Sequence, residues 1–237
     1  MREAARTLCA ELDGSGDPGR AEHLQRFFRT GPGEYGEGDR FLGLRVPEVR
    51  AIARRHRELS LADLADVLAS PWHEHRQAAL FVLADRYRRA APAKREAIAA
   101  FYLDHLDAVN SWDLVDGSAP HILGAHLLHR DRAVLYELAG SGHLWRQRVA
   151  VLATFAFIRA DEFQDTLRLA ELLRDHPHDL IHKAVGWMLR EVGKRDLAAE
   201  ERFLDRHAAH MPRTMLRYAI EKFDPERRRS YLQRPPQ

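Results

Sequence analysis

Amphipathic helical periodicity runs along almost the whole chain of 237 residues, and no segment shows the alternation of polar and apolar residues that a β-strand needs. The predicted helices span residues 2–12, 20–29, 47–57, 61–69, 73–90, 92–106, 111–130, 132–140, 144–160, 162–176, 179–195, 197–210 and 212–223. Pro47, Pro92 and Pro212 favour these starts at first-turn positions, Ser60 does so with Asp63 in a capping box, and Asp161 and Asp179 do so as N-caps. We therefore expect an all-α protein.

A basic residue followed by an apolar run recurs within this helical pattern. The three copies are R-Q-A-A-L-F-V-L from Arg76, R-V-A-V-L-A-T-F from Arg148 and K-A-V-G-W-M-L-R from Lys183, so that 72 residues separate the first two and 35 the last two. A period of about 35 residues with two helices in each unit is typical of HEAT-like repeats. We expect residues 1–237 to form a single α-solenoid of HEAT-like helix pairs, with inner helices lining a concave groove and a C-terminal tail from about residue 225.

The charged residues allow two interpretations. The formal net charge is only +2, but arginine greatly outnumbers lysine, which occurs only at positions 94, 183, 194 and 222. Arginine binds phosphate in a bidentate way that lysine cannot match. A GC-rich genome that favours arginine codons explains the same bias without any ligand. Composition alone therefore does not assign a nucleic-acid partner.

Several classes of protein are disfavoured. No apolar run approaches the roughly 18 residues of a membrane span, and the N-terminal segment is typical of an amphipathic helix rather than a signal peptide. Cys9 is the only cysteine, which excludes an internal disulfide and favours a reducing compartment. We expect a cytoplasmic protein, associated with the nucleoid if it binds DNA, with no membrane partner and no requirement for more than a monomer.

The longest irregular segment is G-P-G-E-Y-G-E-G-D-R-F-L-G-L-R-V-P, residues 31–47. It lacks the G-K-[ST] ending of a P-loop, and no predicted strand precedes it. We interpret it as a structured connector whose glycines adopt positive φ, with close approach to a ligand as the alternative.

The histidines do not form a metal-binding pattern. His178 and His182 are four residues apart, but a zinc site needs a third ligand, and the sequence has no H-E-x-x-H motif. A G-x-S-x-G nucleophile motif is also absent from the sequence. We therefore expect neither a metal nor a cofactor.

Four residues are candidates for catalysis or binding, and they recur at equivalent positions of successive repeats. Trp112 and Asp116 are one helical turn apart and share a helix face, Arg148 opens the apolar run of a later repeat, and Trp187 follows Lys183 by one turn. Each residue taken singly fits core packing or a salt bridge between repeats. Taken together on inner helices, two indoles, a carboxylate and a cation would surround one point. Indole faces attract positive charge, a carboxylate stabilises a developing oxocarbenium ion, and an arginine holds phosphate.

Four motifs carry a resemblance to a known family, over about residues 20–225. The chain resembles the AlkD-type DNA alkylation repair glycosylases in F-F-R-T-G-P-G-E-Y-G-E-G-D-R-F-L-G-L-R-V-P (27–47), N-S-W-D-L-V-D (110–116), W-R-Q-R (145–148) and H-K-A-V-G-W-M-L-R-E (182–191). The resemblance implies a solenoid that cups double-stranded DNA and hydrolyses the N-glycosidic bond of N3- or N7-alkylated purines. It places the catalytic aspartate at Asp116, the groove tryptophans at Trp112 and Trp187, and the phosphate-facing arginine at Arg148. Some relatives act on small lesions and others on bulky adducts, and the motifs do not separate the two.

Binding of DNA would rest on phosphate contacts. The candidate residues are Arg148, Lys183, Lys194, Arg195, Arg213 and Arg217, and the arginines at 227–229 belong either to a solvated tail or to a further contact. Two alternatives remain open at this point: a non-catalytic module that binds nucleic acid by shape, and a protein-binding solenoid scaffold. The preferred lesion is not fixed by the sequence.

Overall fold

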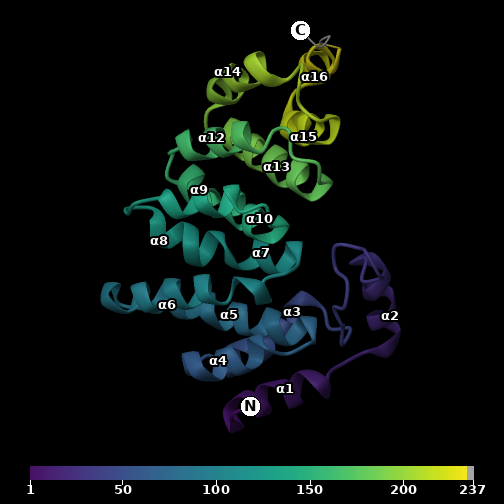
Figure 1. Cartoon of the computed structure of the whole chain (residues 1–237), viewed down its shortest axis with the longest axis vertical. Helices are drawn as coiled ribbons and strands as arrows, with labels where there is room; N and C mark the ends of the chain where they lie inside the picture. The colour runs from purple at the N-terminus through teal and green to yellow at the C-terminus, as the bar shows by residue number, and fades with distance from the viewer. Residues whose placement is uncertain (234–237) are drawn as a thin grey trace. The chain divides into compact units, whose positions relative to one another are not determined.

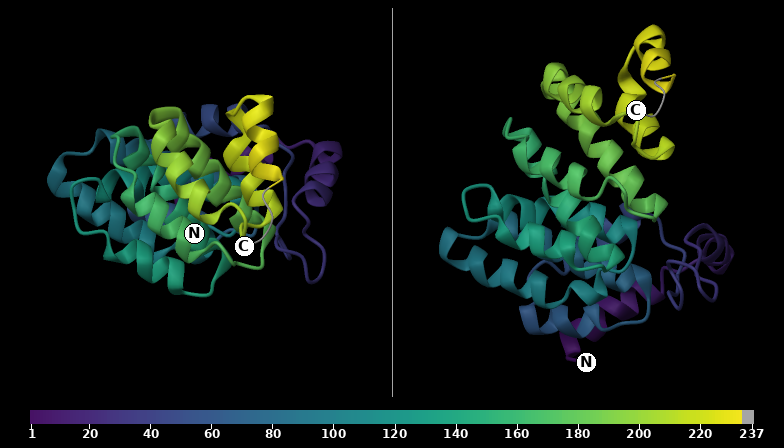
Figure 2. Two further views of the ribbon diagram at one scale, coloured as in Figure 1. Left: turned by 90° about the horizontal axis from the view of Figure 1, so that it is seen from above. Right: turned by 45° about the horizontal axis from the view of Figure 1, so that its top comes forward.

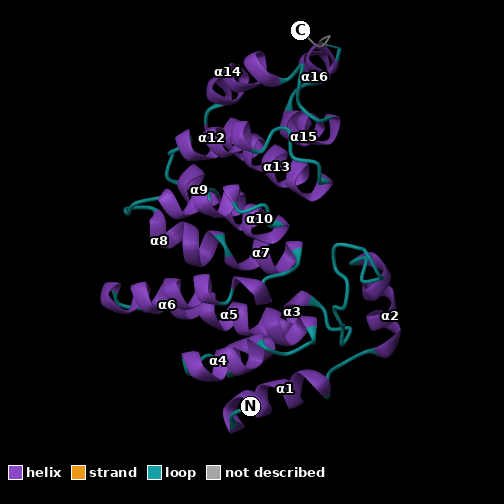
Figure 3. Ribbon diagram, in the orientation of Figure 1, coloured by secondary structure: helices purple, strands orange, loops and turns teal. Residues whose placement is uncertain are grey.

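The computed structural model of the chain describes residues 1–233, and over that range it consists of helices and connections with one isolated β-bridge, between Arg40 and Trp72 (Figure 3). The all-α prediction is therefore confirmed. The fold divides into two compact units, Met1–Ile122 and Leu123–Gln237. Each unit is described by itself, and the expectation of a single repeat domain over residues 1–237 stays a prediction. No described helix is both long and apolar enough to cross a membrane.

The first unit is built around one long helix (Figure 1). Its helices are α1 (Glu3–Asp13), α2 (Pro18–Phe27), α3 (Val46–Arg55), α4 (Leu61–Leu68), α5 (His73–Arg89), α6 (Pro92–Asp104) and α7 (Trp112–Ser118), with a 3-10 turn at Leu106–Ala108. Helix α5 packs against α1, α3, α4, α6 and α7. Leu80 and Leu83 of α5 are almost completely buried, with Leu64 of α4. Burial of such apolar side chains is the main source of the stability of this stack.

Helix α2 differs from its neighbours because it buries none of its residues. It lies at the edge of the first unit in every view (Figure 2). Asp17 caps it by accepting from Arg20 N at 3.0 Å, and Arg20 Nε donates to Gly43 O at 2.7 Å. The helix is thus tied to the following connector rather than to the core.

The second unit is built around α13, which packs against α10, α11, α12, α14 and α15. Its helices are α8 (Ala125–Leu127), α9 (Ala133–Gly140), α10 (Leu144–Ala153), α11 (Phe155–Arg159), α12 (Gln164–Leu172), α13 (Asp179–Arg195), α14 (Leu197–His207), α15 (Arg213–Ala219) and α16 (Pro225–Leu232), with a 3-10 turn at Ile220–Lys222. A Cβ added at Gly186 would lie 2.4 Å from Met215 O, so only glycine allows α13 and α15 to pack this closely.

Two predicted helices are interrupted in the structure. The prediction of one helix over 111–130 is wrong, because α7 ends at Ser118 and a π-helical turn at Pro120–Gly124 follows. Pro120 cannot donate a backbone hydrogen bond, which disfavours a regular helix there. The prediction of one helix over 144–160 is also wrong, since α10 and α11 separate at Thr154, whose hydroxyl donates to Val151 O at 2.7 Å.

Some predicted helix starts are confirmed and others are wrong. Ser60 makes the predicted capping box with Asp63. Asp179 is not a cap, because His178 holds that position and Asp179 is the first residue of α13. Asp161 is not a cap either: it adopts a left-handed φ of 61° and pairs with Arg195. The segment predicted as a C-terminal tail forms α16, capped by Asp224, up to Leu232, while residues 234–237 lie outside the described residues.

Three of the five glycines in the connector at residues 31–45 have the predicted positive φ, whereas Gly31 and Gly36 do not. Gly33, Gly38 and Gly43 have φ values of 75°, 80° and 90°. A Cβ added at Gly43 would lie 2.1 Å from Asp17 O, so this position accepts only glycine. The connector therefore has one defined path between α2 and α3.

Candidate functional site

Helix α7 carries the first pair of predicted site residues. Trp112 is its first residue and Asp116 lies one turn later, and both side chains are half-buried. Burial raises the pKa of the Tyr102 phenol, its hydrogen bond with Ser118 opposes that rise, and the charge of Asp116 adds to it. The Asp116 carboxylate therefore lies within electrostatic reach of a buried hydroxyl that stays protonated. The helix presents an indole and an anion side by side.

Aromatic rings hold Trp112 in place. The Phe28 ring is stacked on the indole, with centroids 5.0 Å apart and an angle of 5° between the planes. Phe27 approaches the same indole edge-on at 6.2 Å and remains 58% exposed. Phe28 in turn stacks on Phe41 at 4.8 Å. The orientation of Trp112 thus depends on rings from the end of α2 and from the connector.

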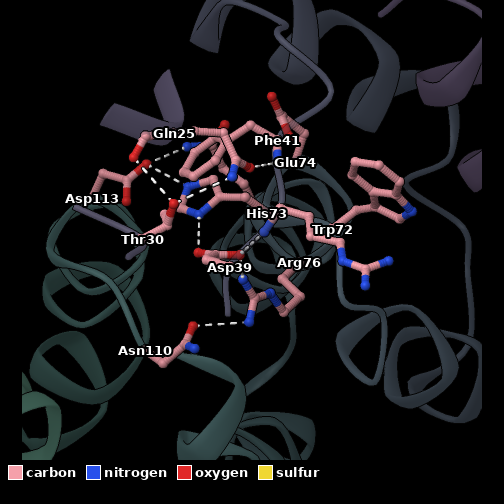
Figure 4. A network of polar contacts seen from close by, with 12 residues as sticks. Gln25, Thr30, Asp39, Phe41, Trp72, His73, Glu74, Arg76, Asn110 and Asp113 are labelled. Carbon is pink, nitrogen blue, oxygen red and sulfur yellow. Dashed lines mark hydrogen bonds and ion pairs between the residues drawn. The ribbon is translucent and has the colours of Figure 1, made fainter. Parts of the chain in front are cut away.

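A buried polar network is centred on His73, whose ring stacks on that of Phe41 and lies 5.2 Å from that of Phe28 (Figure 4). His73, the first residue of α5, is 2% exposed, and its Nδ1 lies 2.8 Å from Asp39 Oδ2 while its Nε2 lies 2.8 Å from Asp113 Oδ2. Arg76 donates to Asp39 and, at 2.9 Å, to Asn110 Oδ1. The network joins the connector, the start of α5 and the start of α7, and so fixes the turn that carries Trp112.

The charge states within this network follow from competition between burial and ion pairing. Burial favours the neutral ring of His73, but the charge of Asp113 and the hydrogen bonds to both carboxylates outweigh it and raise the pKa of His73 to about 9. Burial also opposes ionisation of Asp113, yet the charge and the hydrogen bond of His73 lower the pKa of Asp113. At neutral pH the network therefore holds an imidazolium between two carboxylates.

Glu74 anchors the connector from the next position of α5. Its carboxylate is 2% exposed and accepts three backbone N–H groups, from Leu42 at 2.8 Å, Gly43 at 2.8 Å and Leu44 at 3.2 Å. Hydrogen bonds to a charged acceptor are stronger than those between neutral groups, and a carboxylate is stabilised at the N-terminus of a helix. The connector is therefore fixed on both sides of Phe41.

A cation also lies near the Asp116 turn. The guanidinium of Arg50 on α3 lies 3.9 Å from the centroid of the Phe81 ring, and a Cβ added at Gly117 would lie 3.3 Å from Phe81 Cε1. Arg50 is exposed, and no carboxylate of the described residues pairs with it. Burial and the neighbouring charge of Arg54 lower the pKa of Arg50. Arg50 thus adds positive potential beside the helix that carries Asp116.

The second pair of predicted site residues lies on α10 and α13. Arg148 is only 4% exposed, and its Nη1 donates to Leu180 O, in the first turn of α13, at 2.6 Å. Trp187 is half-buried; its indole N–H donates to Glu191 Oε1 at 3.0 Å, and its ring lies 6.0 Å from that of Phe155. Because α10 and α13 pack directly against each other, Arg148 and Trp187 are carried by neighbouring helices.

The other predicted DNA-binding residues are half-buried or exposed, and several have partners within the second unit. Lys183 pairs with Asp179 at 2.7 Å, Lys194 with Glu191 at 2.6 Å and Arg195 with Asp161 at 2.7 Å. Arg213 donates to Leu232 O at 2.7 Å, and Arg217 is exposed. Surface ion pairs of this kind are weak, so phosphate can compete for these cations.

The structure places the predicted residues in two pairs, Trp112 with Asp116 in the first unit and Arg148 with Trp187 in the second. Their convergence on one substrate stays a prediction. Sequence reasoning missed the network of Asp39, His73 and Asp113, whose members lie 34 and 40 residues apart along the chain. The motif H-E-H at 73–75 stands at the start of a predicted helix, but spacing alone shows neither its burial nor its partners.

Comparison with known proteins assigns the family. The described residues 1–233 form helices and no strand, and α7 carries an indole and a carboxylate one turn apart, which defines an all-α protein with a candidate site on that helix. The family model described as DNA alkylation repair enzyme matches residues 8–223, and the chain belongs to that family. The family assigns the chain a role in the repair of alkylated DNA.

A solved structure supports the fold. The chain is similar to the predicted DNA alkylation repair enzyme from Enterococcus faecalis, with 16% identity, a TM-score of 0.68, and coverage of 89% of this chain and 97% of that chain. At this level of identity the likeness shows the shared all-α solenoid fold alone. No protein of curated function matches the sequence.

Proposed function

We propose that the protein is a DNA glycosylase that hydrolyses the N-glycosidic bond of N3- or N7-alkylated purines in duplex DNA. The observation that carries this proposal is the pair on α7: a half-buried carboxylate one turn from a braced indole, in a chain of the DNA alkylation repair family. The proposed substrate class is the cationic purine, and bulky adducts are candidates beside small methyl groups.

Alkylation at N3 or N7 makes the purine positively charged, so the base leaves without protonation by a general acid. The C1′–N bond breaks with its electron pair going to the base, and the deoxyribose acquires oxocarbenium character. The Asp116 carboxylate would stabilise that charge and orient the water that attacks C1′ and releases a proton. A fixed anion suits this step because it is complementary to charge that develops only in the transition state.

The tryptophans would exclude bulk water from the sugar and contact its cationic face. Trp112 already has one partner ring in Phe28, and Trp187 has its N–H satisfied by Glu191. The N–H of Trp187 therefore needs no new partner when DNA binds. Contact between an indole face and a cation contributes about 0.5–2 kcal/mol. Contacts to the sugar rather than to the base would explain how bulky lesions are accommodated.

Phosphate contacts would supply the affinity. Arg148 is the proposed ligand beside the lesion, with its guanidinium oriented by Leu180 O. Arg50 would supply a second cation on the side of Asp116, since its guanidinium is exposed over Phe81. The remaining proposed contacts, from helices of the second unit, are Lys183, Lys194, Arg195, Arg213 and Arg217. We expect affinity for duplex DNA to fall steeply with salt concentration.

The test is release of free base from duplexes that carry N7-methylguanine, N3-methyladenine or one bulky N3-adenine adduct. Asp116→Asn removes the charge and keeps the shape, and Asp104→Asn on the exposed end of α6 is the matched control. Removal of one preorganised electrostatic group costs about 10²–10³ in rate. DNA binding without release by the wild type would identify a non-catalytic module, and a lack of salt-sensitive binding would favour a protein scaffold.

A further inference from the structure

His73 carries a proton on each ring nitrogen for a geometric reason. Its two nitrogens lie 2.8 Å from carboxylate oxygens of Asp39 and Asp113, and ionised carboxylates only accept hydrogen bonds. Both nitrogens must therefore donate, which requires the imidazolium. The titratable groups around the ring are Asp39 on the connector, Asp113 on α7, and Glu74 and Arg76 on α5 itself.

Two routes connect this ring to the indole of Trp112. Asp113 is the residue after Trp112, so the ion pair with His73 fixes the first turn of α7. The second route is the ring stack: His73 lies 4.4 Å from Phe41 and 5.2 Å from Phe28, and Phe28 lies 5.0 Å from Trp112. Asp113, which follows Trp112 in the chain, and Phe28, which stacks on it, thus both contact the charged ring of His73.

Loss of the proton would change the balance of buried charge. The cations His73 and Arg76 match the anions Asp39 and Asp113. A neutral imidazole donates from one nitrogen only, so one carboxylate would lose its hydrogen bond from the ring and face the lone pair of the other nitrogen. Asp39 would keep Arg76, and Asp113 would keep the amide of Gln77 at 2.9 Å, but the buried network would then hold two anions against one cation. An uncompensated buried charge is costly, and a shift of the connector or of the α7 turn that admits water would relieve it.

We propose that the His73 imidazolium is a positioning residue that holds the Trp112 indole in its working orientation, and that loss of its proton loosens the connector and slows base release. The inference rests on the proposed glycosylase function. His75 offers an internal contrast two residues later: it is bonded to Ser70 and to the single carboxylate of Asp13, and burial lowers its pKa despite the charge of Asp13. His75 does not belong to the ring stack, so its charge state should leave Trp112 unaffected.

The first measurement follows the indole directly in the wild-type protein labelled with 5-fluorotryptophan. The chain has four tryptophans, and single Trp→Phe variants would assign their fluorine resonances. Because the pKa of His73 is about 9, the Trp112 resonance should shift with a midpoint near that pH. Trp145, buried in the second unit, is the internal control and should not shift.

The second measurement is the single-turnover rate of N7-methylguanine release across the same pH range with DNA at saturation. The wild-type rate should fall about 10–100-fold through this transition, the scale expected when a contacting group is displaced slightly. His73→Gln should be slow already at neutral pH and lose the alkaline decrease. His75→Gln should keep the wild-type profile.

The outcomes separate this inference from the function on which it rests. A Trp112 resonance that stays constant with pH, or a wild-type rate that stays constant through the transition, would overturn the positioning role. Both readings use the wild type, so they hold even if His73→Gln fails to fold. Absence of base release at every pH, with Trp112 still titrating, would reject the glycosylase function and reduce the network to a structural contact.

Discussion

The two candidate tryptophans are held by different means in the two units of the molecule. Trp112 is braced by Phe28 from the end of α2 and, through Asp113, by His73 on α5. Trp187 has the hydrogen bond to Glu191, one turn later on its own helix, and the ring of Phe155 at 6.0 Å. The polar support of Trp112 thus comes from a segment distant in sequence, whereas the polar support of Trp187 lies on its own helix. The first should respond to pH and to remote substitutions far more than the second.

The largest expected effect concerns stability and contrasts a buried ion pair with an exposed one. Asp39→Asn removes the charge that pairs with both His73 and Arg76 in the buried network, and we expect a loss of about 3–5 kcal/mol. Asp161→Asn removes the partner of Arg195, whose side chain is 48% exposed, and should leave the unfolding free energy almost unchanged because solvent screens such a pair. Urea unfolding of both variants measures the difference. Equal losses of unfolding free energy in the two variants would contradict the contrast between the buried ion pairs of the first unit and the exposed ion pair of the second.

The second prediction concerns the pH dependence of stability. The folded-state pKa of His73 is about 9, above the ordinary value of 6.5, so its contribution is complete below pH 6.5 and is lost as pH rises through 9. A raised pKa of this size corresponds to about 3 kcal/mol. The unfolding free energy of the wild type should fall by that order between neutral pH and pH 10, and His73→Gln should lack this component. A wild-type curve that is level over this range would refute the imidazolium assignment.

A smaller effect is expected when the support of Trp187 is weakened. Glu191→Gln keeps an acceptor for the indole N–H at 3.0 Å but removes the charge that also pairs with Lys194. We expect less than about 1 kcal/mol of lost stability and a decrease of about 2–5-fold in base release, because the bond is weakened to a neutral one, which contributes about 0.5–1.5 kcal/mol, and is not lost. Calorimetry and single-turnover kinetics provide the two values. A loss as large as that of His73→Gln would show that Trp187 is not held locally.

The smallest effect concerns phosphate binding on the side of Asp116. Arg50→Ala should lower the slope of log K against log salt by about 0.9, the value for one phosphate contact. Arg88→Ala, which removes an exposed arginine paired with Asp85, is the matched control and should leave the slope unchanged. Titration of undamaged duplex DNA by fluorescence anisotropy measures both. An unchanged slope for Arg50→Ala would remove this residue from the binding surface.

The helices could be predicted from the sequence because each depends on local periodicity and on caps. Ser60 with Asp63 is such a local signal, and it gave the correct start of α4. The failures arose where local signals compete: Pro120 lies inside an apolar pattern that continues on both sides, and His178 rather than Asp179 caps α13. Periodicity reports which face is apolar and does not report an interruption of the backbone hydrogen bonds.

The candidate site could be predicted only in part, for a related reason. Trp112 and Asp116 are one turn apart, so their shared face follows from the sequence. The supports of Trp112 do not follow from it, because Phe28, His73 and Trp112 come from three segments that only the folded connector brings together. The path of that connector depends on positive φ values at its glycines and on three backbone hydrogen bonds to Glu74. No spacing rule contains that information.

The most direct test of the central claim, that a carboxylate on α7 stabilises a sugar cation, is a single-turnover comparison of wild type and Asp116→Asn on a duplex with one N7-methylguanine. The wild type should release the free base, and the variant should do so about 10²–10³ times more slowly while binding the duplex with unchanged affinity. Equal rates for the two proteins would contradict the claim.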